Sequence, residues 1–214
     1  RQNWTYDPSA QDRRQTLDHM TDVLDVLAGA RDAGKIRAVG LSNESAWGLT
    51  RWCDVADRIG APRMVSIQNE YSLLHRLFDT DLAEVAVNEG VTLLSYSPLA
   101  AGLLSGKYSG GAMPGGSRAA VDQASGGPGN LGGRRTEAGI AAADAYHALA
   151  VEHGRDPIHM AIAWQQTRPF PVVPIIGATD VAQLDHLIAG LGKALPEELV
   201  QAIDGLHRQF PLPY

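Results

Sequence analysis

The chain has 214 residues, of which 44% are hydrophobic and 20% are charged, as in an ordinary globular protein. Its 18 basic and 24 acidic side chains give a net charge of -6, and no basic stretch is left over for phosphate backbones, which argues against a nucleic-acid-binding protein. The single cysteine, Cys53, excludes an internal disulfide and indicates a reducing, cytoplasmic location, while the lack of any apolar run of about 18 residues argues against a membrane span.

Helix and strand patterns alternate along the chain. Helical spacing of apolar residues, or short apolar runs, marks each element, and Gly, Pro or Ser residues bound it. Helices are predicted at residues 16–33, 45–59, 79–89, 135–153, 157–166, 179–191 and 196–208, and strands at 36–41, 64–67, 91–95 and 171–176. A Gly-rich segment over residues 106–133 has no periodicity, and we expect a mobile loop there.

The length fits one α/β domain or two small ones, and we take residues 1–214 as one domain. The alternation predicts that helices cover a parallel sheet. The apolar runs 64–67 and 91–94 show no polar alternation, so we expect strands that are buried on both faces. A doubly wound sheet and a (β/α)8 barrel both fit this pattern. The junction after the first strand, residues 40–43, lacks the GxGxxG fingerprint of a dinucleotide-binding doubly wound fold, and this favours the barrel.

Hydrogen-bonding and aromatic side chains follow the predicted strands at their carboxyl ends, where parallel α/β folds place their working residues. Ser42 and Asn43 follow the first strand, Gln68 the second, Tyr96 the third and Gly177 the fourth. Helix capping explains Ser42 and Asn43 equally well, and an ordinary loop hydrogen bond explains Gln68.

The segment after the fourth strand has its own alternative explanation. Residues 180–183 resemble a capping box in which Asp180 takes the place of Ser or Thr, and capping alone would account for Gln183. The same helix N-terminus is also a natural site for an anion.

The third strand is followed by an aromatic ring, a loop of small residues and a lysine, in the run SYSPLAAGLLSGKY at residues 95–108. A flat ring beside accessible amides and one cation suits a ligand that carries both an aromatic head and phosphates, as a dinucleotide does. An ordinary surface loop is the alternative.

Other polar residues give weaker signals. The seven histidines show no HExxH or other paired ligand spacing, so the sequence predicts no metal site. Arg134 and Arg135 precede a predicted helix and are expected to be solvated charges, with an approach to the cofactor on closure of the loop as the alternative.

Four motifs in one order resemble the aldo-keto reductase family, nearest its bacterial and potassium-channel β-subunit-like branch. They are GKIRAVGLSN at 34–43, QNEYS at 68–72, the run at 95–108, and IGA at 176–178 with the later pair QL at 183–184. The resemblance covers only the C-terminal half of that family's barrel. It therefore implies the second half of a (β/α)8 TIM barrel, with about four strands, and absence of the N-terminal half.

The resemblance implies an NADP(H) site. Ser42, Asn43 and Gln68 are similar to residues that bind the nicotinamide carboxamide, and Tyr96 to the aromatic residue that stacks on the nicotinamide ring. The residues implied at the pyrophosphate and other phosphates are Ser97, Pro98, Leu99, Ala100, Gly102, Lys107 and Arg118, and those at the adenosine end are Gly177, Thr179 and Gln183. The Gly-rich segment over residues 106–133 lies where the family has a loop that folds over the cofactor.

Two departures from the family pattern stand out. At His186 and Leu187 many relatives have a polar or acidic residue followed by Asn, which contact the adenine, and Leu187 makes no such hydrogen bond. The family's catalytic Asp, Tyr, Lys and His all precede Arg1, so no catalytic residue is assigned in this chain. Tyr71 and Trp4 are candidates for lining the substrate pocket, although packing explains each of them as well.

For the parent protein the resemblance implies NADPH-dependent reduction of an aldehyde or ketone to an alcohol. A small carbonyl compound is the expected partner, without nucleic acid or membrane, and homo-oligomer formation is left open. The alternatives are an NADP(H)-binding sensor or scaffold that turns over slowly, and an inactive truncated fragment, and this chain alone is expected to be inactive. The sequence leaves open the carbonyl substrate and the preference for NADP over NAD.

Overall fold

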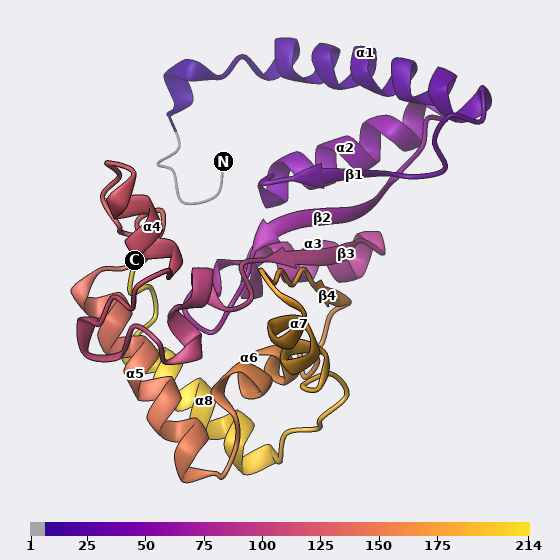
Figure 1. Ribbon diagram of the computed structural model, residues 1–214. Helices are drawn as coiled ribbons and strands as arrows, with labels where there is room; N and C mark the ends of the chain where they lie inside the picture. The colour runs from indigo at the N-terminus through magenta and orange to yellow at the C-terminus, as the bar shows by residue number, and fades with distance from the viewer. Residues whose placement is uncertain (1–6) are drawn as a thin grey trace. The chain divides into compact units, whose positions relative to one another are not determined.

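The computed structural model describes residues 7–214, and the chain divides into two compact units (Figure 1). Of the described residues, the first unit comprises 7–69, 78–94 and 170–173, and the second comprises 70–77, 95–169 and 174–214. Four strands form one sheet in the order β1-β2-β3-β4: β1 (Val39–Ser42), β2 (Met64–Glu70), β3 (Thr92–Tyr96) and β4 (Val172–Pro174). The pair β1–β2 is parallel, and the predicted α/β fold with a parallel sheet is confirmed.

The first unit holds α1 (Arg13–Asp32), α2 (Ala46–Ile59) and α3 (Asp81–Glu89), together with the short 3-10 turns η1 (Pro8–Ala10) and η2 (Leu77–Asp79). Helix α2 contacts both α1 and α3. The core of this unit is apolar, and the side chains of Leu24, Leu49, Cys53, Ile67 and Leu93 are all fully buried in it. Burial raises the pKa of the Cys53 thiol, so the one cysteine is packed as an apolar group.

The second unit holds the helices α4 (Arg118–Ala124), α5 (Glu137–Glu152), α6 (Pro157–Gln165), α7 (Val181–Ile188) and α8 (Glu197–Gln209), and the 3-10 turns η3 (Ala100–Ser105) and η4 (Ser109–Gly111). Helix α5 contacts α6 and α8, and Figure 1 shows α5 and α8 side by side. Large aromatic side chains, those of Tyr71, Tyr108, Tyr146 and Trp164, are almost completely buried in its core.

The predicted helices and strands outside the Gly-rich segment are present, with ends shifted by a few residues. The expectation for residues 106–133 was incomplete, because this segment contains α4 and η4. The Ser117 hydroxyl caps α4 by accepting from the Ala120 amide, and the Asp122 carboxylate accepts from the Gly129 amide at 2.8 Å. Helix α4 has seven residues and buries only Ala119, so it leaves no apolar stripe in the sequence.

The expectation that the strands are buried on both faces was wrong. Exposure alternates along them: in β2, Met64 and Ile67 are buried while Val65 is 49% exposed, and in β4, Val173 is 51% exposed. A continuous apolar run therefore does not report two-sided burial here. Within residues 7–214, no helix is long and apolar enough to cross a membrane.

Candidate functional site

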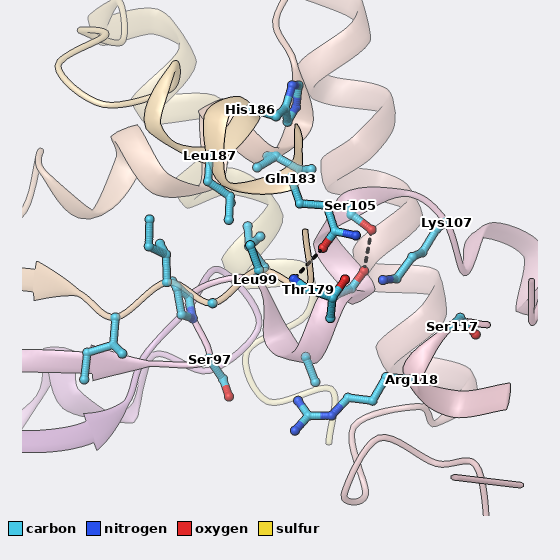
Figure 2. A pocket seen from close by; sticks show the side chains of 18 of the residues that line it. Ser97, Leu99, Ser105, Lys107, Ser117, Arg118, Thr179, Gln183, His186 and Leu187 are labelled. Atoms are coloured by element: carbon cyan, nitrogen blue, oxygen red, sulfur yellow. Dashed lines mark hydrogen bonds between the residues drawn. The ribbon is translucent and has the colours of Figure 1, made fainter. Parts of the chain in front are cut away.

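A pocket of about 1100 Å³ lies in the second unit, where the segments after β3 and β4 meet α4 and α7 (Figure 2). Most of the residues predicted to bind the cofactor line it: Tyr96, Ser97, Pro98, Leu99, Gly102, Lys107, Arg118, Gly177, Thr179 and Gln183. The chain therefore brings together two sequence motifs that lie some 80 positions apart, the run 95–108 and the segment 176–183.

The loop after β3 is tightly wound. Ser97, Ala100 and Ala101 have φ values of 53°, 48° and 56°, in the left-handed region that costs energy for any residue with a Cβ. The Ala100 amide donates to the Ser97 carbonyl oxygen at 2.8 Å, and the Gly102 amide donates to the Leu99 carbonyl oxygen at 2.9 Å. Figure 2 also shows the Ser105 hydroxyl bonded to the Gly102 carbonyl oxygen, at 2.7 Å.

Ala100 differs from the other predicted residues of this loop. It is fully buried, its amide is engaged within the loop, and it does not line the pocket. Its left-handed backbone helps to shape the loop, and we therefore withdraw it from the set of residues that face a ligand.

Lys107 lies directly over the backbone of this loop. A Cβ on Gly102 would stand 3.0 Å from Lys107 Cε and 3.2 Å from its Nζ, and the φ of Gly102 is 97°. The backbone conformation thus favours glycine at 102, and a larger residue there would also make the end of the Lys107 side chain shift. Figure 2 shows Lys107 and Arg118 at the pocket, and none of the described lining residues carries a carboxylate.

The far end of the pocket is formed by α7 and the segment before it. The predicted capping contact of Asp180 is confirmed, because the Gln183 amide donates to Asp180 Oδ1 at 2.9 Å. The Gln183 side-chain oxygen accepts from the Thr179 amide at 3.3 Å (Figure 2), one residue before the N-cap amide that a standard capping box uses. Gln183 Nε2 also donates to Asp180 Oδ2 at 2.6 Å. His186 and Leu187, the two departures from the family pattern, line the same end.

Buried polar groups hold the end of β3, where Tyr96 enters the pocket. The Tyr71 amide donates to the Tyr96 carbonyl oxygen at 3.3 Å, and Gln165 Nε2 donates to the Tyr71 carbonyl oxygen at 3.2 Å. Gln165 also accepts from the Ser95 hydroxyl. Burial raises the pKa of Tyr96, and the Glu70 carboxylate raises it further, so its ring faces the pocket as an uncharged phenol.

Tyr71 itself is a core residue. Its side chain is fully buried, and its ring stacks on that of Trp164 with centroids 5.2 Å apart. The proposed role of Tyr71 in lining a substrate pocket has no support in this arrangement. Trp4, the other candidate for that role, lies outside the described residues.

An ionic network holds the C-terminal end of the Gly-rich segment, and no pattern in the sequence indicated it. Arg134 binds Glu70 through two hydrogen bonds of 2.8 Å, and the Tyr214 hydroxyl donates to Glu70 Oε1 at 3.1 Å. The Glu70 side chain is 4% exposed and the Arg134 side chain 16%. The expectation of a solvated Arg134 was therefore wrong, because the carboxylate that pairs with it is 64 positions earlier in the chain.

The three residues expected at the nicotinamide carboxamide belong to the first unit. Ser42 is the register partner of Gln68, and the Asn43 amide donates to the Gln68 carbonyl oxygen at 2.9 Å. Asn43 Nδ2 lies 3.3 Å from the Ser42 hydroxyl. The capping interpretation of Ser42 and Asn43 was wrong, since Ser45 caps α2 instead.

Several lining residues were not identified in the sequence: Ala101, Ser105, Gly116, Ser117, Val121, Ile158, Ile175, Ile176 and Ala182. Ser117 had a usable signal, because serine before a short Ala-rich stretch is typical of a helix N-cap. Ile158 had none, since it comes from α6 and its place at the pocket depends on tertiary packing alone.

A sequence model described as Aldo/keto reductase family matches residues 4–208. The chain belongs to this family. It is 41% identical to Protein tas of Escherichia coli over 194 residues, which are 91% of this chain and 54% of that protein.

Two further relatives agree. The chain is 33% identical to an aldo-keto reductase of Babesia bovis over 174 residues, with 77% of this chain and 58% of that protein covered. It is 37% identical to a Mycobacterium bovis protein named Uncharacterized oxidoreductase Mb2320 over 188 residues, covering 86% of this chain and 54% of the relative. The chain thus spans little more than half the length of these relatives.

Proposed function

We propose that the pocket binds NADP(H), and that the chain carries the cofactor site of an oxidoreductase that reduces aldehydes or ketones to alcohols. One observation carries this proposal. The chain has a net charge of -6, yet the residues of fixed charge that line the described pocket are two cations, Lys107 and Arg118. An acidic protein that keeps only positive charge at its pocket is suited to a ligand with several phosphates.

The residues present fit the parts of a dinucleotide. The uncharged ring of Tyr96 offers a stacking surface, and Lys107 and Arg118 offer charge for phosphates. The exposed backbone of Gly177 and Thr179 leaves space for the adenosine end, where Leu187 supplies an apolar contact. The expected binding of the nicotinamide carboxamide by Ser42, Asn43 and Gln68, which belong to the first unit, stays a prediction.

When bound, the cofactor would supply the hydride for carbonyl reduction. Reduction also needs a proton donor for the developing alkoxide, and we assign none in this chain. We therefore propose that the four strands are the second half of a (β/α)8 barrel, and that the catalytic residues belong to the first half. The coverage of about half of each relative supports this proposal, and the chain alone is expected to bind the cofactor without turnover.

A titration of the purified chain with NADPH, followed by isothermal calorimetry, tests the site. We expect Lys107→Met and Arg118→Met each to weaken binding about tenfold, because a hydrogen bond to a charged group contributes about 1.5–3 kcal/mol. Lys35→Met removes an equally exposed charge in the first unit and serves as the matched control. Added salt should weaken wild-type binding more than that of either pocket variant.

The proposal fails if both pocket variants bind NADPH as tightly as wild type does. The same titration with NADH measures the preference for the 2'-phosphate. A protein that includes the first half of the barrel should reduce a test aldehyde with NADPH, and tight binding without any turnover by that longer protein would favour a cofactor sensor over a reductase. The cytoplasmic location expected from the single cysteine stays a prediction.

A further inference from the structure

Two histidines and an aspartate from separate helices come together beside the pocket. Asp156 is the N-cap of α6, His159 lies in the first turn of α6, and His186 lies in the last turn of α7. One ligand atom from each residue lies within 4.8 Å of the other two. His159 and His186 are 27 positions apart, which is why no ligand spacing appears in the sequence.

The hydrogen bonds of His159 define which of its nitrogens carries the proton. Nε2 lies 2.7 Å from the carbonyl oxygen of His186, and a carbonyl only accepts, so Nε2 is the donor. Nδ1 lies 3.0 Å from Lys193 Nζ, and an ammonium only donates, so Nδ1 is the acceptor. In this arrangement the Nδ1 lone pair of His159 is directed at the Lys193 ammonium.

This pattern is the one that metal-binding histidines use. Such a histidine donates its second ring N–H to a carbonyl or carboxylate, which fixes the tautomer and the ring orientation. In His159 that partner is the His186 carbonyl oxygen. Packing adds a second restraint, because a Cβ on Gly190 would stand 2.6 Å from His159 Cδ2 and 3.1 Å from its Cα.

Asp156 and His186 complete the cluster. Asp156 Oδ1 accepts from the His159 amide at 3.0 Å, which fixes the carboxylate, and Oδ2 lies 3.2 Å from His186 Nε2. The His186 ring stacks on the His159 ring with centroids 4.6 Å apart. The side chains of His186 and Asp156 are 45% and 34% exposed, so an ion can enter from solvent.

We propose that Asp156, His159 and His186 form a binding site for a divalent transition-metal ion of the Zn²⁺ type. Two imidazole nitrogens and one carboxylate oxygen, with water as the fourth ligand, are a tetrahedral zinc set. On binding, the ion takes the place of the Lys193 ammonium at Nδ1, and Lys193 turns to solvent with its protons. The ion also takes the place of any proton on His186 Nε2, and that proton passes to solvent. Nitrogen ligands select Zn²⁺, Ni²⁺ or Cu²⁺ over Mg²⁺ and Ca²⁺.

The consequence of occupancy follows from where the ligands lie. The site would join the start of α6 to the end of α7, and α7 carries Gln183 and Leu187 into the pocket. A bound ion would therefore hold this wall of the pocket in place. The proposal concerns the metal site itself and does not depend on whether the pocket binds NADP(H).

Equilibrium dialysis of the tag-free chain against Zn²⁺ alone tests the site, with thermal unfolding as a second measurement. We expect one ion per chain and a rise in the melting temperature on binding. His159→Ala and His186→Ala should each weaken binding by at least about tenfold, a loss that even outer-shell partners of metal sites can cause. Asp156→Asn, which preserves the helix cap, should also weaken it.

Lys193→Met provides the sharpest test. Loss of the ammonium from the Nδ1 lone pair should tighten Zn²⁺ binding about fivefold, because a unit charge a few ångströms away opposes the ion. If the cluster only forms hydrogen bonds, then Lys193→Met should have the same Zn²⁺ affinity as wild type. His19→Ala removes an exposed histidine from α1 and should bind as wild type does.

Three results would overturn the proposal: a Zn²⁺ dissociation constant weaker than about 1 mM, wild-type affinity in both histidine variants, or no effect of Lys193→Met. Each variant is checked by circular dichroism, so that loss of the fold is not read as loss of a ligand. Replacement of Zn²⁺ by Co²⁺ gives an independent readout, since its visible absorption bands report a tetrahedral site with nitrogen ligands, and Mg²⁺ should not compete.

Discussion

Two loops line the pocket, and they are built in different ways. The loop after β3 contains Ser97, Ala100 and Ala101 with left-handed backbone, and hydrogen bonds within the loop bind it to itself. Residues 177–180, after β4, are exposed, and a Cβ on Gly177 would meet nothing within 4 Å. The first loop carries strain that surrounding structure must support, and the second carries none of that kind.

The contacts that hold the two loops also differ, because those of the first loop are buried and those of the second are exposed. The end of β3 is held by the Gln165 hydrogen bonds and lies near the buried pair Glu70–Arg134. The segment after β4 is held by the capping contact of Asp180 and Gln183, which is exposed to solvent. The loop that we propose for the phosphates is thus fixed in shape when the chain folds, whereas the segment that we propose for the adenosine depends on one helix cap.

The largest expected effect comes from breaking the buried ion pair under the first loop. Arg134→Met should lower the free energy of unfolding by about 3–5 kcal/mol, because it leaves the Glu70 carboxylate buried without its charged partner. Urea denaturation measures the loss. Tyr96 lies in the field of this pair, so NADPH binding should weaken as well.

A double variant distinguishes loss of the Glu70–Arg134 ion pair from a general loss of packing. Glu70→Leu with Arg134→Met removes both charges and should recover part of the lost stability, since well-packed apolar residues often replace a buried pair at little cost. Arg14→Met, at an exposed pair of α1, should change stability by less than about 1 kcal/mol. Equal losses in Arg134→Met and Arg14→Met would show that the network does not support the loop.

An intermediate effect is expected from a pair of glycines, one in each loop. Gly102→Ala should cost about 2–3 kcal/mol, because φ is 97° there and the new Cβ would press on Lys107. Gly177→Ala places a methyl group in open space at an ordinary φ and should cost less than about 0.5 kcal/mol. Thermal unfolding of the two variants measures the difference between the loops directly.

The same pair reports on the ligand. Displacement of Lys107 in Gly102→Ala should also weaken NADPH binding, whereas a loss that is confined to stability would mean that Lys107 does not contact the phosphates. If Gly177→Ala lowers stability more than Gly102→Ala does, then the proposed difference between the strained loop after β3 and the exposed segment after β4 is wrong.

The parts of the site that the sequence predicted are those encoded locally. The carboxyl end of each strand, the small-residue loop with Lys107 and the capping contact of Asp180 each depend on residues a few positions apart, and periodicity and capping rules report such features. Helix α4, within residues 106–133, was not predicted because it buries only one alanine and so has no apolar periodicity. The burial of Arg134 was not predicted, because an arginine pair before a helix has the same local sequence whether or not a distant carboxylate pairs with it in the folded chain.

The exposed face of the strands was not predicted for a similar reason. The exposed Val65 and Val173 are as apolar as the less exposed Met64 and Val172 beside them, so composition does not reveal which face of the sheet is covered. The cluster of Asp156, His159 and His186 also has no local signature, because α6 and α7 bring it together only in the folded chain. Long-range pairings of polar groups are therefore the part of this site that required the structure.

The smallest expected effect concerns the cap of the second loop. Asp180→Ala removes the acceptor for the Gln183 amide and should cost about 1 kcal/mol. Asp180→Asn keeps an acceptor at the same position and should lower the stability by only about a few tenths of a kcal/mol. Because the cap is exposed and local, the loss should appear as faster hydrogen exchange at the first amides of α7, without a change at the loop after β3. Faster exchange in both loops would mean that the two walls of the pocket are coupled, and that the adenosine side is as much a part of the prebuilt site as the phosphate side.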